Sequence, residues 1–356
     1  MAKHAFLLLF SLIIKILLQT TIATTHENRS PKTTNHTVEE AYKVLGISQN
    51  PDGSLTREIR IPMVNATPFV DPTKLTPIAL SKDVFLNPFT NKSWVRLFRP
   101  LRPPRNTKLP LIIYLHGGDF VLFSATTLVF HNFCNAISSQ VPAVIVSVEY
   151  RLAPEHRLPA AFDDAVNAIL WVKNQALGIL DRDPWLEKYA DFSRVFLLGS
   201  ASGGNIVYHA ALRSLDFDLH PVQIQGIIMN QPYFSGVQRT ESELRLIEDP
   251  YLPLYVNDVL WTLALPENAN RDHAFCNPLT LGSYFGKVKR LPRCMVKGNT
   301  EDPLVDRGKN LVKLLESFGV QVVSLIVEGG FHGVELTNVT AAQELYNFIK
   351  DFILSV

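Results

Sequence analysis

Two titratable residues stand in the order and the kind of loop that acid–base catalysis requires. Asp302 follows a predicted strand at residues 293–296, and His332 follows another at residues 320–327. A histidine that a carboxylate orients can accept and return protons near neutral pH. We therefore assign His332 as a candidate general base and Asp302 as the acid that orients it.

A glycine motif earlier in the chain could stabilise negative charge. The letters His-Gly-Gly-Asp-Phe occupy residues 116–120, directly after a predicted strand at residues 111–115. Consecutive glycines allow backbone N–H groups to point at one position in a cavity, which is how an oxyanion hole is built. Taken alone, the motif fits a plain Gly-Gly turn equally well.

The segment at residues 195–205 has the glycine pattern of a nucleophile elbow without its serine. It reads Val-Phe-Leu-Leu-Gly-Ser-Ala-Ser-Gly-Gly-Asn, which places Ala201 at the centre of the G-x-S-x-G pattern. Alanine has no oxygen that could attack a carbonyl carbon, so no acyl-enzyme can form there. Ser202 would become the central serine if the chain shifted by one residue between strand and helix.

Alternating strand and helix patterns would bring these motifs together. Strand patterns occupy residues 94–98, 111–115, 143–148, 195–198, 224–229 and 320–327, and helix patterns occupy 160–173, 205–213, 308–318 and 341–354. This alternation predicts an α/β fold with a mostly parallel sheet and helices on both faces. Ligands bind beyond the carboxyl ends of parallel strands, where all these motifs lie.

Together the motifs resemble the plant carboxylesterases of the hormone-sensitive-lipase-like group of α/β-hydrolases. The resemblance runs from about residue 44 to residue 352 and includes Glu-Tyr-Arg-Leu-Ala-Pro-Glu-His-Arg-Leu-Pro-Ala-Ala at 149–161. It implies an eight-stranded sheet, a cap and a Ser-His-Asp triad that contains His332 and Asp302. The implied oxyanion donors are the backbone N–H groups of Gly117, Gly118 and Ser202.

The chain departs from that group at two site positions. The group's elbow reads Gly-Asp/Glu-Ser-Ala-Gly-Gly-Asn, so Ala201 takes the nucleophile position when no gap is allowed. Asp119 stands where the group usually has a third glycine and where gibberellin receptors have serine. A carboxylate there opposes an oxyanion and favours a cation. Two roles for Asp119 stay open: it contacts an amine or iminium nitrogen of a substrate, with Phe120 beside it in the binding site, or it turns away and caps a local backbone N–H.

Several functions are compatible with this set of residues. The leading one is a repurposed enzyme that uses His332 and Asp302 for cyclisation, elimination or isomerisation of a plant specialised metabolite. The resemblance supports it, because plant alkaloid cyclases have arisen within the carboxylesterase group. The alternatives are ester hydrolysis through Ser202 or a water activated by His332, non-catalytic binding as in gibberellin receptors, and a gene copy without a selected role.

The chain begins with the layout of a secretory signal peptide. Lys3 precedes an apolar run at residues 5–14, which continues beyond Lys15, and small residues follow at 21–23. We expect cleavage after residues 1–23, no membrane attachment afterwards, and delivery to the endoplasmic reticulum, a vacuole or the exterior. The Asn-x-Ser/Thr acceptors that agree with secretion begin at Asn28, Asn35, Asn65, Asn91 and Asn338.

The remaining chain divides into a short leading segment and one large domain. We expect residues 24–61 to form a linker and an N-terminal cap segment, and residues 62–356 to form the α/β-hydrolase domain. A cap insertion is expected at residues 242–265. Its aromatic side chains Tyr251, Tyr255 and Trp261 are expected to be exposed.

Composition excludes several classes of protein and partner. The 356 residues carry 34 Lys+Arg against 33 Asp+Glu, which gives no reason to expect nucleic acid as a partner. A hydrophobic content of 47% excludes a disordered chain. No spacing of His and Cys resembles a metal site, and no phosphate or dinucleotide loop occurs, so we expect a small-molecule substrate and neither metal nor organic cofactor.

Overall fold

The computed structural model describes residues 36–58, 61–73, 76–87, 93–105, 107–179, 181–280 and 282–355. The predicted signal peptide at 1–23 lies outside these residues, as do Asn28, Asn35 and Asn91. Their assignments stay predictions.

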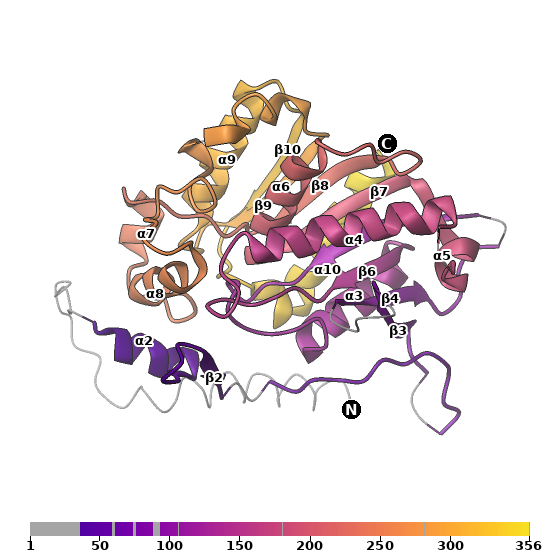
Figure 1. Cartoon of the computed structure of the whole chain (residues 1–356), viewed down its shortest axis with the longest axis horizontal. Helices are drawn as coiled ribbons and strands as arrows, with labels where there is room; N and C mark the ends of the chain where they lie inside the picture. Colours follow the sequence, from indigo (N-terminus) through magenta and orange to yellow (C-terminus); the bar gives the residue numbers. More distant parts are fainter. Residues whose placement is uncertain are drawn as a thin grey trace.

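A mostly parallel sheet of eight strands runs through the centre of the described chain, in the order β10-β9-β8-β7-β5-β6-β4-β3 (Figure 1). The strands are β3 (Ala79–Phe85), β4 (Trp94–Pro100), β5 (Leu109–Leu115), β6 (Val144–Val148), β7 (Ala190–Ser200), β8 (Ile224–Asn230), β9 (Cys294–Asn299) and β10 (Val322–Val327). Strand β4 pairs antiparallel with both β3 and β6, and the other pairs are parallel. The predicted eight-stranded α/β fold is therefore confirmed.

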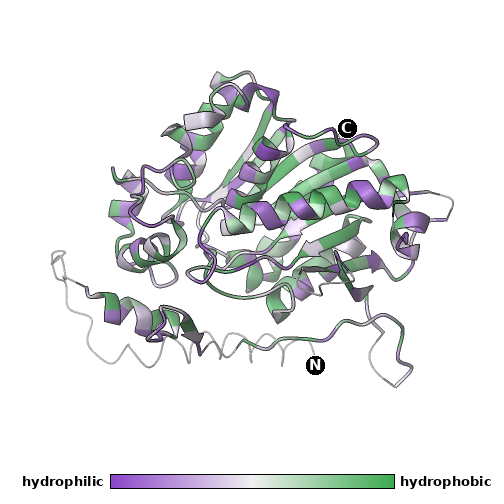
Figure 2. Cartoon of the chain, in the orientation of Figure 1, coloured by the Kyte–Doolittle hydropathy of each residue, from purple (hydrophilic) through white to green (hydrophobic). Residues whose placement is uncertain are grey.

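Helices cover both faces of this sheet. The first face packs against α3 (Leu128–Gln140) and α10 (Val339–Leu354), and the second against α4 (Ala160–Leu177), α6 (Ser202–Ser214) and α9 (Val305–Ser317). Alternate side chains of β5 show the division, since Ile112 packs on the first face and Ile113 on the second. Figure 2 shows the strands as largely hydrophobic, whereas the helices mix hydrophobic and hydrophilic residues.

Two further segments lie beside one end of the sheet. The N-terminal segment contains α2 (Val38–Leu45) and the antiparallel pair β1 (Ile47–Gln49) and β2 (Leu55–Arg57). The later segment contains α7 (Glu241–Arg245) and α8 (Leu254–Ala264), and residues 241–264 are called the cap segment below. Helix α2 packs beside α8, and His36 stacks on Tyr255 with ring centroids 3.9 Å apart. Short helices complete the described chain: α5 (Pro184–Tyr189), η1 (Pro278–Thr280), η2 (Gly282–Tyr284), η3 (Val288–Arg290) and η4 (Val334–Leu336).

The expectation that Trp261 is exposed is wrong. Its indole is fully buried and stacks on Tyr233, with ring centroids 4.8 Å apart. Tyr251, by contrast, is 40% exposed, as expected. Helix α8 thus turns its tryptophan toward the domain, and this aromatic contact attaches the later segment to the end of β8.

Replacement of Ile349 by alanine tests the packing of α10. Ile349 is fully buried against the sheet, so Ile349→Ala should lower the free energy of unfolding by about 2–5 kcal/mol. Leu354 lies on the same helix but is 61% exposed, and Leu354→Ala should have little effect. Urea unfolding followed by circular dichroism measures both; equal losses would contradict this packing.

Candidate active site

The turn between β7 and α6 has the geometry of a nucleophile elbow, and Ala201 occupies its strained position. Ala201 has φ 50° and ψ −118°, a conformation that costs a non-glycine residue energy. A Cβ on Gly203 would lie 1.9 Å from the carbonyl oxygen of Leu115, and one on Gly199 would lie 2.0 Å from that of Gly203. The turn therefore requires glycine at both residue 199 and residue 203. Ala201 occupies the centre of the elbow, so the one-residue shift that would place Ser202 there is not found.

Ser202, the alternative nucleophile, lies beneath the site. Its side chain is fully buried, and its hydroxyl oxygen accepts a hydrogen bond of 2.9 Å from the backbone N–H of Asp119. Ser200 and Ala201 contribute to the cavity lining, but Ser202 does not. The Ser202 hydroxyl thus connects α6 with the loop after β5.

The glycine loop after β5 lies directly against Ala201. A Cβ on Gly117 would lie 3.3 Å from the Cβ of Ala201, and Gly118 has φ +114°, which a side chain would strain. Both glycines line the cavity beside Ala201. This placement allows their backbone N–H groups to serve as the predicted oxyanion donors.

His332 and Asp302 meet although they are 30 residues apart in the chain. The His332 Nδ1–H donates a hydrogen bond of 2.9 Å to Asp302 Oδ2, and Asp302 Oδ1 accepts one of 2.9 Å from the backbone N–H of Leu304. Asp302 is almost fully buried, whereas His332 lines the cavity. The carboxylate thus holds the ring, and the imidazole is the group that can reach a ligand.

Negative charge around His332 stabilises its protonated form. Burial alone would lower the pKa of the imidazole. The charge and hydrogen bond of Asp302 raise this pKa by more than burial lowers it, and the charges of Asp119 and Glu335 raise it further. The pKa of His332 is raised to about 9. At neutral pH the ring therefore carries a proton.

Asp119 also lines the cavity, and its carboxylate has no hydrogen-bond partner among the described residues. The alternative in which this carboxylate caps a local backbone N–H is therefore not found there. Burial is the main reason that the pKa of Asp119 is raised to about 6, with nearby Asp302 adding to the rise and His332 opposing it. The carboxylate is free to meet a ligand.

Phe120 does not line the cavity, contrary to its assignment beside Asp119 as a ligand contact. Its ring is 1% exposed and packs against Trp261 and Tyr233, with centroid distances of 5.4 and 6.0 Å. The positive φ of 65° at Phe120 turns this side chain into the core. Phe120 therefore supports the cap segment.

The cavity encloses about 260 Å³ and is mainly apolar, with a few polar groups among its walls. Its lining includes Ile61, Pro62, Phe123, Leu128, Val129, Phe130, Tyr251, Phe331, Gln231, Glu335, Leu336 and Thr337. Sequence reasoning missed Glu335 and Gln231. Gln231 lies two residues after the predicted strand at 224–229, which is a usable signal, but Glu335 has no motif of its own.

Gln231 and the cap hold the loop of His332 in place. The Gln231 amide donates to the carbonyl oxygen of Phe331 at 3.0 Å and accepts from the N–H of Gly333 at 2.9 Å, so it brackets His332. Tyr251 of the later cap segment stacks on Phe331, with centroids 3.9 Å apart. Contacts on both sides therefore fix the position of the imidazole.

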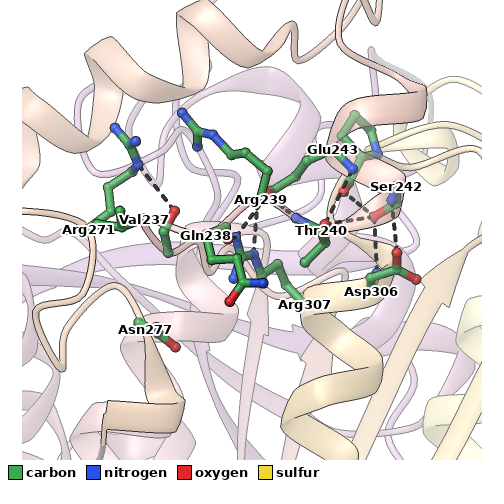
Figure 3. A network of polar contacts seen from close by, with 12 residues as sticks. Val237, Gln238, Arg239, Thr240, Ser242, Glu243, Arg271, Asn277, Asp306 and Arg307 are labelled. Atoms are coloured by element: carbon green, nitrogen blue, oxygen red, sulfur yellow. Dashed lines mark hydrogen bonds and ion pairs between the residues drawn. The ribbon is translucent and has the colours of Figure 1, made fainter.

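The same cap segment is bonded to residues 303–307, and Figure 3 shows Ser242 and Glu243 beside Asp306 and Arg307. Arg307 donates hydrogen bonds of 2.9 and 2.8 Å to the two carboxylate oxygens of Glu243, and both side chains are buried. The Ser242 hydroxyl donates to the carbonyl oxygen of Pro303 at 2.7 Å, and the backbone N–H of Ser242 donates to the Asp306 carboxylate at 2.8 Å. The start of α7 and the loop of Asp302 therefore form one connected unit.

Two of the predicted Asn-x-Ser/Thr acceptors lie on the surface. Asn65 and Asn338 are exposed, and the Asn338 side chain caps the N-terminus of α10. Cys134, Cys276 and Cys294 are buried and unpaired.

The described residues contain no group of three or more His, Cys, Asp or Glu side chains that could hold a metal ion. Among the described helices, none is both long and apolar enough to span a membrane.

Comparison with known proteins finds similarity over most of the chain. A family profile described as alpha/beta hydrolase fold matches residues 112–336. A 3-O-acetylpapaveroxine carboxylesterase of Papaver somniferum is 46% identical over 88% of this chain and 99% of its own length. Probable carboxylesterase 8 of Arabidopsis thaliana is 44% identical over 89% of this chain and 94% of its own. The solved esterase of the archaeon Pyrobaculum calidifontis superposes with a TM-score of 0.66 at 25% identity, covering 78% of this chain and 86% of that one.

The raised pKa of His332 predicts how stability depends on pH. Because this pKa is about 9 in the folded protein and 6.5 ordinarily, the stabilisation is complete below pH 6.5 and is lost as the pH rises through 9. The loss should amount to about 3 kcal/mol at most. Asp302→Asn removes the main charge partner and should flatten this dependence. Urea unfolding between pH 6 and 9.5 measures it; parallel curves for the two proteins would contradict the assignment.

Proposed function

The chain belongs to the α/β-hydrolase family, among the plant carboxylesterases of the hormone-sensitive-lipase-like group, and we propose that it has exchanged ester hydrolysis for acid–base chemistry on a small molecule. The observation that carries this proposal is the combination of Ala201 in the strained elbow with an intact His332–Asp302 pair beside it. Acyl transfer needs a nucleophile that Ala201 cannot supply. Proton transfer needs only a positioned acid or base.

The proposed reaction is cyclisation, elimination or isomerisation of a plant specialised metabolite that bears an amine or iminium nitrogen, as in an alkaloid intermediate. The mainly apolar cavity of about 260 Å³ suits a small, largely apolar ligand. The unpartnered carboxylate of Asp119 favours a cation over the oxyanion of an ester intermediate. Two relatives at 46% and 45% identity are named for 3-O-acetylpapaveroxine, which supports a small metabolite as the substrate class.

The secretory pathway remains our proposal for the location of the protein. Its support is the residue pattern at 1–23 and the Asn-x-Ser/Thr acceptors, two of which, at Asn65 and Asn338, lie on the surface. A lumenal enzyme would meet metabolites sorted into the same compartments.

The main alternative is residual ester hydrolysis, which the names of the relatives favour. Hydrolysis through Ser202 is opposed by its burial and by the hydrogen bond that its hydroxyl accepts. Hydrolysis through a water activated by His332 requires a neutral ring, whereas the pKa of about 9 keeps that ring protonated at neutral pH. The binder alternative, as in gibberellin receptors, predicts ligand stabilisation without any product.

Restoration of the serine tests the missing nucleophile. The native protein should leave p-nitrophenyl acetate unhydrolysed above background, whereas Ala201→Ser should hydrolyse it, at least tenfold faster than the native protein. The rate of the variant should rise with pH toward 9, because His332 must lose its proton before it can activate the introduced hydroxyl group. Release of p-nitrophenol measures the rates.

Two matched variants distinguish a missing nucleophile at Ala201 from a shifted nucleophile at Ser202. His332→Ala added to Ala201→Ser should abolish the gained hydrolysis. Ser202→Ala in the native background should leave the hydrolysis of p-nitrophenyl acetate at the background rate. Native hydrolysis that Ser202→Ala stops would overturn the proposal and make the protein a carboxylesterase with a shifted serine.

A further inference from the structure

We propose that Asp119 is the proton acceptor of this site and that His332 is its proton donor, so that the histidine does not serve as the base. The inference rests on the proposed function and deepens it: it assigns a second catalytic residue and defines the substrates as iminium ions or the enamines related to them. It arises from the way in which carboxylates from separate segments act on one imidazole that lines the cavity.

Carboxylates from four separate segments act on His332. Asp302 follows β9 and bonds to the ring, Glu335 lies in η4, Asp119 follows β5, and Asp249 lies in the cap segment. A cation in the same part of the described chain is Lys297, whose buried ammonium donates to Asn299 at 3.0 Å and interacts with Asp302 and Glu335. The acidic groups outnumber it, and an imidazole in such surroundings retains its proton.

Three of the four carboxylates already have protein donors. Asp302 binds His332, and a Glu335 oxygen accepts a hydrogen bond of 2.6 Å from the amide of Asn230. Asp249 accepts bonds of 2.8 and 2.7 Å from the N–H groups of the two residues at 251 and 252. Among the described residues, Asp119 alone of the four has no donor on either carboxylate oxygen. Glu335, which also lines the cavity, keeps Oε2 without a donor, but that oxygen is fully buried. Asp119 is therefore the carboxylate that is placed to take a proton from a ligand.

Asp119 is also held in the position that this role needs. Its backbone has φ 55°, and its N–H donates to the buried hydroxyl of Ser202 at 2.9 Å. The pKa of the carboxyl is raised to about 6, so it is ionised at neutral pH yet basic enough to accept a proton. Ser202 is thus a positioning residue for the base, which gives this buried serine a function without nucleophilic attack.

The proton transfers balance without an oxidant or reductant. Asp119 removes a proton from the carbon next to a C=N⁺ bond; the C–H electron pair becomes a C=C bond, and the C=N π electrons move to nitrogen to form a neutral enamine. Where the substrate carries a further C=C bond conjugated with this enamine, His332 protonates the far end of the resulting dienamine; the C=C electrons shift along the chain and restore a C=N⁺ bond. Transfer of the proton from Asp119 to His332 returns the site to its starting state, and the net change is isomerisation.

Titration of His332 by NMR tests the assignment without any substrate. In ¹⁵N-histidine-labelled protein, with His332→Gln to identify the signal, the ring should remain protonated at pH 7.5. Asp119→Asn and Glu335→Gln should each lower the pKa of His332, because each removes one negative charge that faces the ring. A neutral ring at pH 7.5 in the native protein would overturn the role of His332 as donor.

Deuterium exchange tests Asp119 as the base. The probe is the 1,2-dimethyl-3,4-dihydroisoquinolinium ion, whose charge is independent of pH and whose 1-methyl protons exchange only through the enamine. In D₂O the native protein should accelerate this exchange, and Asp119→Asn should lose at least about 100-fold of that acceleration. Glu335→Gln alters the same electrostatic surroundings but should change the rate by less than about tenfold. Equal losses in both variants would reduce Asp119 to an electrostatic role and overturn its assignment as base.

The outcomes separate this inference from the proposed function. Probe-induced changes in the His332 signal without exchange would overturn Asp119 as the base and leave the amine-binding site intact. Absence of any probe-induced change at millimolar concentration would contradict cations as the ligand class, and with it the substrate proposed above. Asp119→Glu, which keeps the carboxylate, should recover part of the exchange that Asp119→Asn loses.

Discussion

The backbone of α6 approaches the backbone of β5 so closely that no side chain fits between them, and the arrangement of the site depends on this approach. A Cβ on Gly203 would lie 1.9 Å from the Leu115 carbonyl oxygen. The approach forces the sharp turn that strains Ala201 and brings the Gly117 loop against it. This costly turn persists here although the hydroxyl that it normally presents is absent. The turn therefore still serves the site, because it shapes the cavity wall and positions Ser202 beneath Asp119.

The charge of this cavity is unsuited to the negatively charged intermediate of ester hydrolysis. An oxyanion hole needs surroundings that welcome negative charge, and Asp119 beside Gly117 and Gly118 opposes it. The same carboxylate, together with Asp302 and Glu335, holds a proton on His332. Alanine at position 201 and a protonated His332 are therefore physically consistent with the proposed function, which favours cationic ligands over ester intermediates.

The sequence predicts the sheet and the acid–base pair well, because local patterns encode them. Buried parallel strands such as β5 read as short apolar runs, and chain order places Asp302 and His332 in adjacent loops. The start of α6 is harder to predict. Gly203 and Gly204 suggest a loop, and the predicted helix begins at residue 205, yet both glycines lie in the first helical turn of α6. The burial of Trp261 and Phe120 escapes prediction because it depends on their contact with each other and with Tyr233, which joins distant segments. Glu335 enters the cavity through tertiary packing, which no local pattern reveals.

The stacking of Tyr251 on Phe331 links the roof of the cavity mechanically to its chemistry. Phe331 is the residue before His332, so the cap cannot lift at this point without pulling on the chain that carries the imidazole. The buried bond between Arg307 and Glu243 ties the same cap to the helix after Asp302. Under the proposed function, the contacts that line the cavity at Tyr251 are therefore also the contacts that orient the proton donor.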